Sequence, residues 1–356
     1  MSRVFLTHIL PPAQCATYHL SIAASNFSYA LIEGGLFDSV YSTMPPFVTA
    51  HRNELKEESF TLVYSRLHSW GRRWGSLASI HDQILMFRRI PRGTKLWLYN
   101  VSQLNFVLVL LLWMFKRGTM INVIELDHTP STRLSIHRLF QNIINRSHGV
   151  ICLSDSPLLT NMNRCCLPGV VSPTVGNASR IKRAGKSFLL SGTLNEHIAM
   201  QSQILILFSQ MPELTLHITG KSENEGQLRE YADRYENIIY HGQVDRTEYR
   251  TILQSVTFVL STRDPEHPDN ALNFPSKIIE ALSCNRGVIS TIHYPQLAPL
   301  KYLEVDVRHL AEDFHRIASM SAEDLVPYVN QSELTRRAFS TKVWDEKMKQ
   351  IENYES

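Results

Sequence analysis

The sequence predicts an α/β protein made of two doubly wound domains. The second half alternates short apolar strands with helices, from a strand at 187–193 to a strand at 287–292. The first half repeats the alternation, with strands at 95–101, 120–128 and 148–155. This pattern is typical of parallel sheets covered by helices on both faces. A chain of 356 residues is too long for one ordinary core and suits two domains.

The domain boundaries follow from a change in composition near the middle of the chain. Residues 167–187 hold glycines, prolines and small polar residues without a sustained period, which is typical of a loop. We therefore expect a first domain over 1–170, a linker over 171–186, a second domain over 187–330 and a C-terminal segment over 331–356 that crosses back toward the first domain.

Two segments of the sequence, 339–354 and Phe106–Phe115, are expected to form helices. In residues 339–354 the apolar positions recur at helical spacing, and Trp344 is expected to anchor the packing of that helix. Phe106–Phe115 is a run of ten apolar residues followed by Lys116-Arg117-Gly118. The run is too short to span a membrane, which predicts a buried helix ending at a glycine cap, with a membrane segment as the alternative.

Charge is divided unevenly between the halves. Residues 1–175 carry 16 Lys and Arg against 9 Asp and Glu, a net charge of +7, whereas residues 176–356 carry 20 against 24, a net charge of −4. A basic half indicates an anionic partner. A membrane surface, a lipid phosphate and a nucleic acid are all candidates, and a solvated basic face is the alternative.

Cysteine usage and the N-terminus indicate a cytoplasmic protein. The five cysteines show no CxxC spacing, and no His-x-His pattern accompanies them, so we expect reduced thiols and no metal site. The first fifteen residues lack the long apolar run and cleavage site of a signal peptide.

Three strand ends in the second half point to a ligand site. Residues 191–194 and 218–226 each place a glycine where we expect the backbone to pass close to a ligand, and residues 261–277 form a long connection that ends at a helix. Ligands of doubly wound sheets bind beyond the carboxyl ends of the strands, and the cleft between two such domains is the default site.

The residues around that helix start suggest a nucleotide diphosphate. A helix N-terminus attracts phosphate, and Arg263 and Lys277 flank the connection with full positive charges. Glu280 lies one turn after Lys277, and an ionised carboxylate accepts the two hydroxyls of a ribose. The alternative is a helix capped by Ser276 with a surface ion pair between Lys277 and Glu280. Neither a Walker loop nor a GxGxxG motif occurs, which argues against P-loop NTPases and ordinary dehydrogenases.

The run at 261–291 resembles the donor-site segment of bacterial glycosyltransferases of the GT-B fold, similar to glycosyltransferase family 4. The shared features are an arginine after a strand, an asparagine, a PSK triplet, a glutamate and a G-x-VIST-like strand, here Arg263, Asn270 or Asn273, Pro275-Ser276-Lys277, Glu280 and Gly287–Thr291. The order of the preceding strands matches too, so the resemblance covers most of 187–350.

This resemblance implies a GT-B architecture, in which two doubly wound Rossmann-like domains face each other across a cleft. The donor, a nucleoside diphosphate sugar, is expected in the second domain. Lys277 and Arg263 would hold the diphosphate, and Glu280 would hold the ribose. The remaining expected donor-binding residues are Gly192, Thr193, Asn273 and Ser276.

The expected catalytic residues lie in the first domain, in the sequence IELDHTP. The family often has an aspartate or a histidine at the equivalent strand end, near the transferred sugar. Asp127 and His128 would position sugar hydroxyls or assist proton transfer. The alternative role of Asp127 is local hydrogen bonding in the Asp-His-Thr-Pro turn.

Two departures from the family pattern bear on mechanism. Many relatives carry a second glutamate where this chain has Leu272, and a basic pair where it has Thr193, Asn195 and His197. They keep two alternatives open, namely a nucleotide-sugar epimerase of the same fold and a catalytically silent partner subunit.

The resemblance implies transfer of a sugar to an acceptor hydroxyl, with retention at the anomeric carbon and without a metal or other cofactor. The expected setting is bacterial capsule, O-antigen or exopolysaccharide assembly. The acceptor would be a glycan or a lipid-linked glycan. The basic first half would then contact the anionic inner face of the plasma membrane rather than a nucleic acid.

Overall fold

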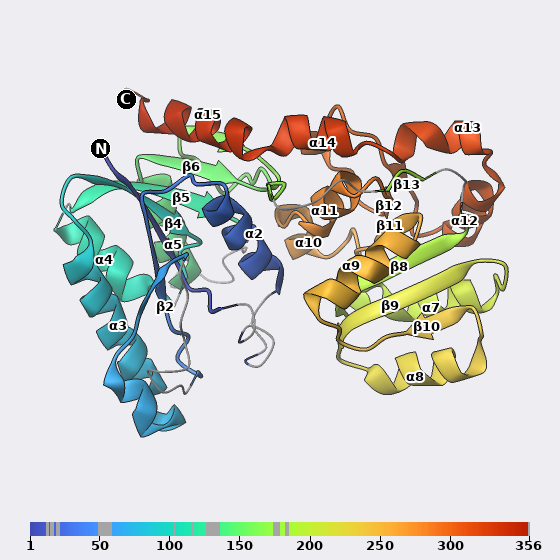
Figure 1. Ribbon diagram of the computed structural model, residues 1–356, viewed down its shortest axis with the longest axis horizontal. Helices are drawn as coiled ribbons and strands as arrows, with labels where there is room; N and C mark the ends of the chain where they lie inside the picture. Colours follow the sequence, from blue (N-terminus) through green and yellow to red (C-terminus); the bar gives the residue numbers. More distant parts are fainter. Residues whose placement is uncertain are drawn as a thin grey trace. The chain divides into compact units, whose positions relative to one another are not determined.

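The chain folds into two compact units, each with its own sheet (Figure 1). Unit 1 comprises Met1–Thr174 together with Ser340–Ser356, and unit 2 comprises Val175–Phe339. The computed structural model describes residues 1–11, 14, 18, 22–48, 59–102, 104–115, 117–125, 136–173, 179–181 and 185–354. Both sheets are parallel and carry helices, which confirms the predicted α/β class.

Unit 1 contains a seven-stranded sheet with the strand order β3-β2-β1-β4-β5-β6-β7. Every neighbouring pair is parallel. The chain first builds outward from β1 to β3 and then returns to add β4 on the other side of β1. This reversal between β1 and β4 is the point at which doubly wound sheets bind ligands. The strands are β1 (Arg3–Thr7), β2 (Ser39–Thr43), β3 (Thr61–Val63), β4 (Thr94–Tyr99), β5 (Gly118–Ile124), β6 (Gly149–Cys152) and β7 (Arg164–Cys166).

Helices cover both faces of this sheet. One face presents Leu6, Leu96 and Leu98 to a core that includes residues of three helices, α3 (Gly75–Arg89), α4 (Phe106–Met114) and α5 (Ile136–Asn145). The other face presents Tyr99, whose ring lies 5.8 Å from that of Phe27 in α2 (Ile22–Glu33). Two short 3-10 helices, η1 (Arg66–Trp70) and η2 (Arg72–Trp74), precede α3.

The last helix, α15 (Thr341–Glu352), belongs to unit 1 although the preceding helix belongs to unit 2. Trp344 is fully buried, and its indole Nε1 donates to the carbonyl oxygen of Gly169 at 2.8 Å. The prediction that Trp344 anchors the packing is therefore confirmed.

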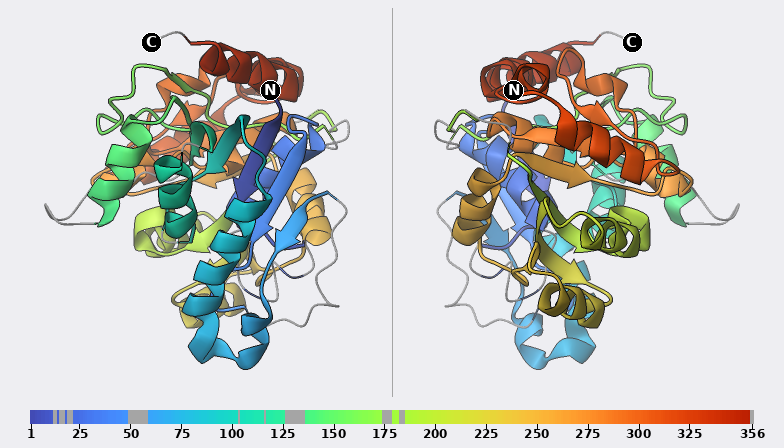
Figure 2. Two further views of the ribbon diagram at one scale, coloured as in Figure 1. Left: turned by 90° about the vertical axis from the view of Figure 1, so that its left-hand side faces the viewer. Right: turned by 90° about the vertical axis from the view of Figure 1, so that its right-hand side faces the viewer.

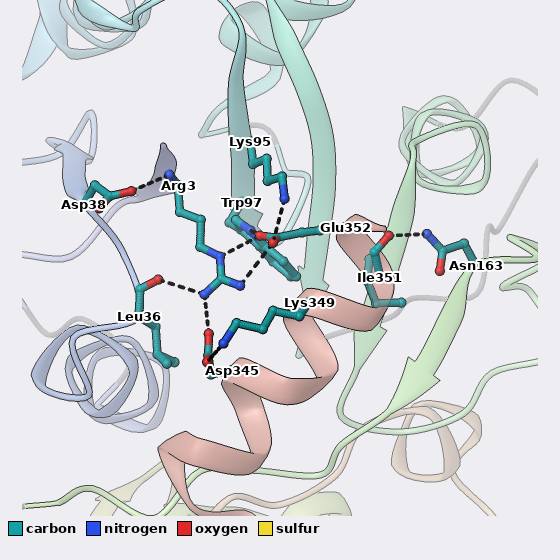
Figure 3. A network of polar contacts seen from close by, with 10 residues as sticks. All are labelled: Arg3, Leu36, Asp38, Lys95, Trp97, Asn163, Asp345, Lys349, Ile351 and Glu352. Atoms are coloured by element: carbon teal, nitrogen blue, oxygen red, sulfur yellow. Dashed lines mark hydrogen bonds and ion pairs between the residues drawn. The ribbon is translucent and has the colours of Figure 1, made fainter. Parts of the chain in front are cut away.

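A polar network secures the other end of α15 (Figure 3). The Glu352 carboxylate accepts hydrogen bonds from Arg3 Nε at 2.7 Å, Lys95 Nζ at 2.9 Å and Trp97 Nε1 at 3.1 Å. Burial alone would raise the pKa of Glu352, but these donors outweigh it and the pKa lies below its usual value. The Asp345 carboxylate accepts a hydrogen bond from Arg3 Nη1 at 2.5 Å. The Arg3 guanidinium therefore joins Asp345 and Glu352, which lie two turns apart on the helix.

Unit 2 contains a six-stranded parallel sheet with the order β10-β9-β8-β11-β12-β13. This is the same pattern as in unit 1, and the reversal falls between β8 and β11. Every neighbouring pair is again parallel. The strands are β8 (Ser187–Leu194), β9 (Thr215–Ser222), β10 (Ile238–Tyr240), β11 (Phe258–Ser261), β12 (Gly287–Ser290) and β13 (Leu303–Glu304).

The core of unit 2 centres on an aromatic cluster. The ring of Phe188 lies 5.2 Å from Phe208, 5.6 Å from Phe258 and 5.7 Å from Phe314, and all four are buried. The helices of this unit are α6 (Glu196–Ala199), α7 (Gln201–Ser209), α8 (Glu225–Arg234), α9 (Arg246–Ser255), α10 (Pro268–Leu272), α11 (Lys277–Ser283), α12 (Leu310–Ser319), α13 (Ala322–Leu325) and α14 (Ser332–Phe339), with 3-10 turns η3 (Pro295–Leu297) and η4 (Val326–Tyr328).

The apolar run at 106–115 differs from its prediction. The helix ends at Met114, and Gly118 opens β5 instead of capping the helix. A Cβ on Gly118 would lie 2.4 Å from the Thr94 carbonyl oxygen, so this glycine is required by the close approach of β4. The last residues of the run, Trp113 to Phe115, are exposed rather than buried. Within the described part of the chain, no helix is long and apolar enough to cross a membrane.

The network around Glu352 leads to a stability prediction. In Glu352→Ala, Arg3 and Lys95 lose the carboxylate that compensates their partial burial, so we expect a loss of about 3 kcal/mol in the free energy of unfolding. Glu346→Ala, on an exposed position of the same helix, should change it by less than about 0.5 kcal/mol. Urea unfolding of both variants measures the difference, and equal midpoints would show that α15 does not depend on this network.

Candidate functional site

The carboxyl edge of the unit 2 sheet gathers most of the predicted donor-binding residues. Ser191 and Gly192 lie near the end of β8, Arg263 follows β11, and Lys277 opens α11. Because β8 and β11 are the strands between which the sheet reverses, these residues meet at the ligand-binding position of a doubly wound sheet.

Lys277 points back toward β8. Its Nζ lies 3.3 Å from the carbonyl oxygen of Ser191, and the side chain is partly buried. Burial lowers the pKa of Lys277, and the neighbouring charge of Arg263 lowers it further, to about 7. The lysine forms no ion pair with Glu280. The alternative of a surface pair, with Ser276 as the cap, is therefore wrong, since the Ser276 side chain makes no capping hydrogen bond either.

Hydrogen bonds hold both the backbone and the guanidinium of Arg263. Its backbone N–H donates to Thr291 Oγ1 at 2.8 Å, and the Thr291 hydroxyl donates to its carbonyl oxygen at 2.5 Å. One guanidinium nitrogen, Nη1, donates to the Asn273 carbonyl oxygen at 3.0 Å. The buried Nε has no hydrogen-bond partner among the residues that the structure describes, and burial lowers the pKa of the group.

Two cations thus lie together without a compensating anion. In the part of the chain that the structure describes, neither Lys277 nor Arg263 forms an ion pair with a carboxylate. The adjacent Asp264 lies 3.8 Å from His197 Nδ1 instead. Burying like charges side by side is unfavourable unless a ligand compensates them. This arrangement is suited to an anion with several oxygens.

Glu280 faces a tyrosine that the sequence did not single out. Tyr249, on α9, donates its hydroxyl to Glu280 Oε2 at 3.3 Å. Burial raises the pKa of Tyr249 well above its usual value, and the charge of Glu280 adds to the effect. A phenol that stays protonated is a permanent donor, so it fixes one oxygen of Glu280. No motif marks Tyr249, because it lies within a polar helix pattern.

A second tyrosine underlies Arg263. Tyr294 is 4% exposed, and its ring packs edge-on against Phe274 at 5.1 Å. Burial raises the pKa of Tyr294 to about 12, against a smaller opposing effect from Arg263. Its hydroxyl oxygen has no hydrogen-bond partner in the described residues. Sequence reasoning missed this residue as well, since it follows the motif by seventeen positions and nothing local distinguishes it.

The asparagines at 270 and 273 have different positions. The Asn270 amide is buried and donates to the carbonyl oxygens of His197 at 2.7 Å and Asp264 at 2.8 Å, so it joins the loop after β11 to the turn after β8. Asn273 is partly buried and presents its carbonyl to Arg263. Leu272, where relatives carry a second carboxylate, is buried.

Gly220 in β9 and Gly192 in β8 are in different structural situations. Gly220 adopts φ +137°, and a Cβ there would lie 1.9 Å from the Gly192 carbonyl oxygen, so it is needed for close strand pairing. Both strands continue past their glycines, which corrects the expectation that they end there. Gly192 adopts φ +103° with open space around it, and Thr193 beside it is exposed.

The predicted catalytic residues, Asp127 and His128, lie outside the described residues. A different group of polar side chains occupies the carboxyl edge of the unit 1 sheet. Glu125 follows β5 and is 6% exposed, and its Oε2 has no hydrogen-bond partner among the described residues. Burial raises the pKa of Glu125 to about 7. From the sequence IELDHTP we selected Asp127 as the candidate. Glu125 was not selected, because it directly follows the apolar residues of the strand.

His8 and Tyr99 lie at the reversal between β1 and β4. Their rings are 5.8 Å apart, and both His8 Nδ1 and the Tyr99 hydroxyl are buried without a partner in the part of the chain that the structure describes. Burial lowers the pKa of His8 to about 4, so its ring is neutral at physiological pH. Asn100 adopts φ 48° and accepts the Glu125 N–H at 2.8 Å, and such strained residues cluster at functional sites.

No group of three or more histidine, cysteine, aspartate or glutamate side chains that would hold a metal occurs among the residues described. The four cysteines in that part of the chain, Cys152, Cys165, Cys166 and Cys284, are free thiols.

Comparison with known proteins identifies the fold. No family model and no curated protein matches the chain. Among solved structures, it is similar to HepE from Anabaena, solved with UDP and glucose, with 13% identity and a TM-score of 0.66 over 98% of each chain. It is also similar to the N-terminal domain of Candida albicans trehalose-6-phosphate phosphatase, with 10% identity and a TM-score of 0.67 over 98% of this chain and 97% of that one.

A third similar structure is AviGT4, a glycosyltransferase involved in avilamycin A biosynthesis. It is 12% identical, with a TM-score of 0.60 over 99% of this chain and 97% of its own. At such identities the likeness establishes the fold alone. The chain therefore has the GT-B fold, with a Rossmann-like sheet in each unit.

The lowered pKa of Lys277 leads to a stability prediction. Between pH 7 and 10.5 the unfolded chain holds a proton that the folded lysine has lost, so wild-type stability rises with pH across this window. Without ligand, Lys277→Met should therefore stabilise the protein at or below pH 7 by about 2 kcal/mol, and the gain should vanish near pH 10.5. The exposed Lys221→Met is the matched control, with no comparable pH dependence. A stability loss at pH 7 in Lys277→Met would contradict the burial of an uncompensated charge, and thermal melts across pH measure it.

Proposed function

We propose that this protein is a glycosyltransferase that moves a sugar from a nucleoside diphosphate sugar to an acceptor hydroxyl. The observation that carries the proposal is the uncompensated cation pair of Lys277 and Arg263 at the carboxyl edge of the unit 2 sheet. The GT-B fold supports it, because HepE, with the same fold, was solved with UDP and glucose. The resemblance of 261–291 to the donor segment of family 4 enzymes gives independent support.

In this proposal each side chain of the unit 2 edge has a separate part. Lys277 Nζ and the Arg263 guanidinium bind the diphosphate and stabilise the negative charge that develops on it as the sugar leaves. Glu280, oriented by the Tyr249 hydroxyl, accepts the ribose hydroxyls. Gly192 and Ser276 offer backbone amides to the phosphates. Protein cations carry this charge, so the proposed reaction needs no metal ion.

We assign acceptor binding to unit 1. Glu125, His8 and Tyr99 supply buried polar atoms that lack partners within the described ranges, and none of the three carries a positive charge at neutral pH. Such a set suits neutral hydroxyl groups better than phosphates. We propose that Glu125 binds the attacking hydroxyl and accepts its proton, alongside the predicted contribution of Asp127 and His128. Retention at the anomeric carbon remains the expectation from the family resemblance.

The proposed setting is the assembly of a bacterial capsule, O-antigen or exopolysaccharide at the inner face of the plasma membrane. The acceptor would be a glycan or a lipid-linked glycan. The net charge of +7 in residues 1–175 supports a surface of anionic lipid.

A catalytically silent partner subunit is the second candidate, and one observation favours it. Leu272 is buried and apolar where related enzymes place a carboxylate. The two candidates separate when purified protein is incubated with UDP- and GDP-sugars, with and without acceptor glycans. Release or transfer of sugar supports the transferase, binding without turnover supports the silent subunit, and conversion of the nucleotide sugar alone would reveal an epimerase.

Donor binding should be linked to proton uptake. Free Lys277 has a pKa of about 7, and a bound diphosphate favours its charged form. Above pH 7 the Kd for UDP should therefore rise about tenfold per pH unit until the pKa of the complex is reached. Calorimetry at pH 8 in buffers of different ionisation enthalpy should detect uptake of about one proton by the wild type.

Lys277→Arg is the matched control for that experiment, because arginine stays charged throughout. Its UDP binding should lose the pH dependence attributed to Lys277. Lys277→Ala should weaken UDP about 10- to 100-fold at pH 7. Equal proton uptake by wild type and Lys277→Arg would show that Lys277 does not bind the diphosphate.

Glu125→Gln should slow the transfer step and leave the binding of the donor unchanged. Loss of the proton acceptor should lower kcat for transfer by about 100-fold. The Kd for UDP should not change, because the proposed UDP site lies in unit 2. The rise of wild-type activity through about pH 7 should also disappear. The exposed Asp155→Asn serves as the control in unit 1, and a Glu125→Gln enzyme with wild-type kcat and pH profile would exclude this role.

A further inference from the structure

An exposed apolar ridge runs along helix α3 of unit 1. At its start, Trp70 is 62% exposed, Trp74 45% and Leu77 53%. Ile80 is exposed as well, and Ile84 and Phe87 are half-buried further along the helix. We call these residues, with Trp113, Met114 and Phe115 at the end of α4, the α3 ridge.

The ridge is continuous. The rings of Trp70 and Trp74 lie 5.8 Å apart, and those of Phe87 and Phe115 lie 5.6 Å apart. Between them the helix repeat brings Leu77, Ile80, Ile84 and Phe87 onto one side, because residues three and four apart are neighbours on a helix surface. The fifteen residues of α3 extend over about 22 Å. In the left panel of Figure 2, α3 crosses the side of unit 1 that faces the viewer.

These side chains are exposed because the opposite side of α3 already fills the core. Ala78, Asp82 and Met86 are buried there. A rotation of the helix that buried Leu77 and Ile80 would expose Met86 and the Asp82 carboxylate. The exposure is thus built into the packing of unit 1 and is not a fraying of the chain.

Buried contacts also fix both ends of the ridge. Near the start, His68 Nε2 lies 2.6 Å from Asp82 Oδ2, and His68 Nδ1 lies 3.1 Å from the Val48 carbonyl oxygen. This buried pair ties η1, which carries Trp70, to α3. At the far end, Arg117 donates to the Ile90 carbonyl oxygen at 2.9 Å and stacks over the Phe87 ring at 4.7 Å. The aromatic residues are therefore presented in fixed positions.

Positive charge predominates in the segment of the chain that carries the ridge. Between residues 59 and 124 the one acidic residue is Asp82, which is buried against His68. The same segment contains nine Lys and Arg residues, of which Lys95 is paired with Glu352, namely Arg66, Arg72, Arg73, Arg88, Arg89, Arg92, Lys95, Lys116 and Arg117. Arg66, Arg73, Arg88, Arg89 and Arg92 are exposed.

This combination identifies the kind of partner. Exposed tryptophan and leucine beside arginine are characteristic of helices that lie in the membrane interface, where aromatic rings sit at the level of the headgroups and arginines meet anionic lipids. A second copy of this chain would bring the same arginines against each other, which is unfavourable for an isologous contact.

We propose that the α3 ridge docks this protein onto an anionic lipid bilayer. Trp70, Trp74 and Leu77 insert at one end, Trp113 and Phe115 insert at the other, and the surrounding arginines contact lipid phosphates. The proposal stands on the surface of unit 1 and does not depend on the donor site of unit 2.

Vesicle flotation tests the proposal with the full chain. The wild type should float with vesicles of phosphatidylcholine and phosphatidylglycerol, and at least tenfold less with phosphatidylcholine alone or at high salt. A variant with Trp70→Ser, Trp74→Ser and Leu77→Ser should lose at least tenfold in binding to the anionic vesicles. A second variant, Arg73→Glu with Arg88→Glu, should lose binding similarly while keeping the apolar residues.

The matched control is Ile206→Ser with Arg234→Glu, an exposed apolar and a basic residue of unit 2, which should bind vesicles like the wild type. Thermal melting and the UDP-induced shift should match the wild type in all variants, which separates loss of docking from misfolding and from the donor site. Vesicle binding by the ridge variants at wild-type strength, or no binding by the wild type, would overturn the proposal.

Tryptophan fluorescence gives an independent readout. Of the five tryptophans, Trp97 and Trp344 are fully buried, whereas Trp70, Trp74 and Trp113 are exposed on the ridge. Anionic vesicles should shift the emission to shorter wavelength, and lipids brominated on their acyl chains should quench it. Unchanged emission, or a dimer in sedimentation that the ridge substitutions dissociate, would show that the bilayer is not what covers this surface.

Discussion

Two like charges held together without a counterion are the constraint on which the account of unit 2 depends. Lys277 and Arg263 arrive from different elements, and the reversal of strand order between β8 and β11 brings them to one place. Thr291 fixes the backbone of Arg263, and the Asn273 carbonyl oxygen accepts a hydrogen bond from its guanidinium. Holding these two charges together costs free energy that an anionic ligand offsets, so the pair favours tight binding of phosphate groups.

The two units use the same sheet plan for different chemistry. Each has a strand reversal with polar side chains at its carboxyl edge. In unit 2 these side chains are cationic. In unit 1 the buried atoms without partners among the described residues belong to His8, Tyr99 and Glu125, and burial favours the neutral forms of His8 and Glu125. One edge therefore suits a diphosphate and the other suits hydroxyl groups, which is the division that sugar transfer between a nucleotide and an acceptor requires.

The sequence predicted what depends on neighbours in the chain. Alternating apolar runs identified the strands, and the one-turn spacing of Lys277 and Glu280 suggested the donor site that we propose. Residues that the tertiary fold brings to the unit 2 site from distant parts of the sequence were not predicted. Tyr249 meets Glu280 from another helix, and Gly220 is explained by a carbonyl on the adjacent strand. The α3 ridge was missed because an amphipathic helix pattern does not reveal which of two apolar sides faces the core.

The central claim is that Lys277 and Arg263 bind a nucleoside diphosphate, and a crystal structure of the protein with UDP tests it most directly. We expect phosphate oxygens within about 3 Å of Lys277 Nζ and of the Arg263 guanidinium, with the ribose hydroxyls on Glu280. UDP bound elsewhere, or bound with its diphosphate out of reach of both cations, would contradict the account.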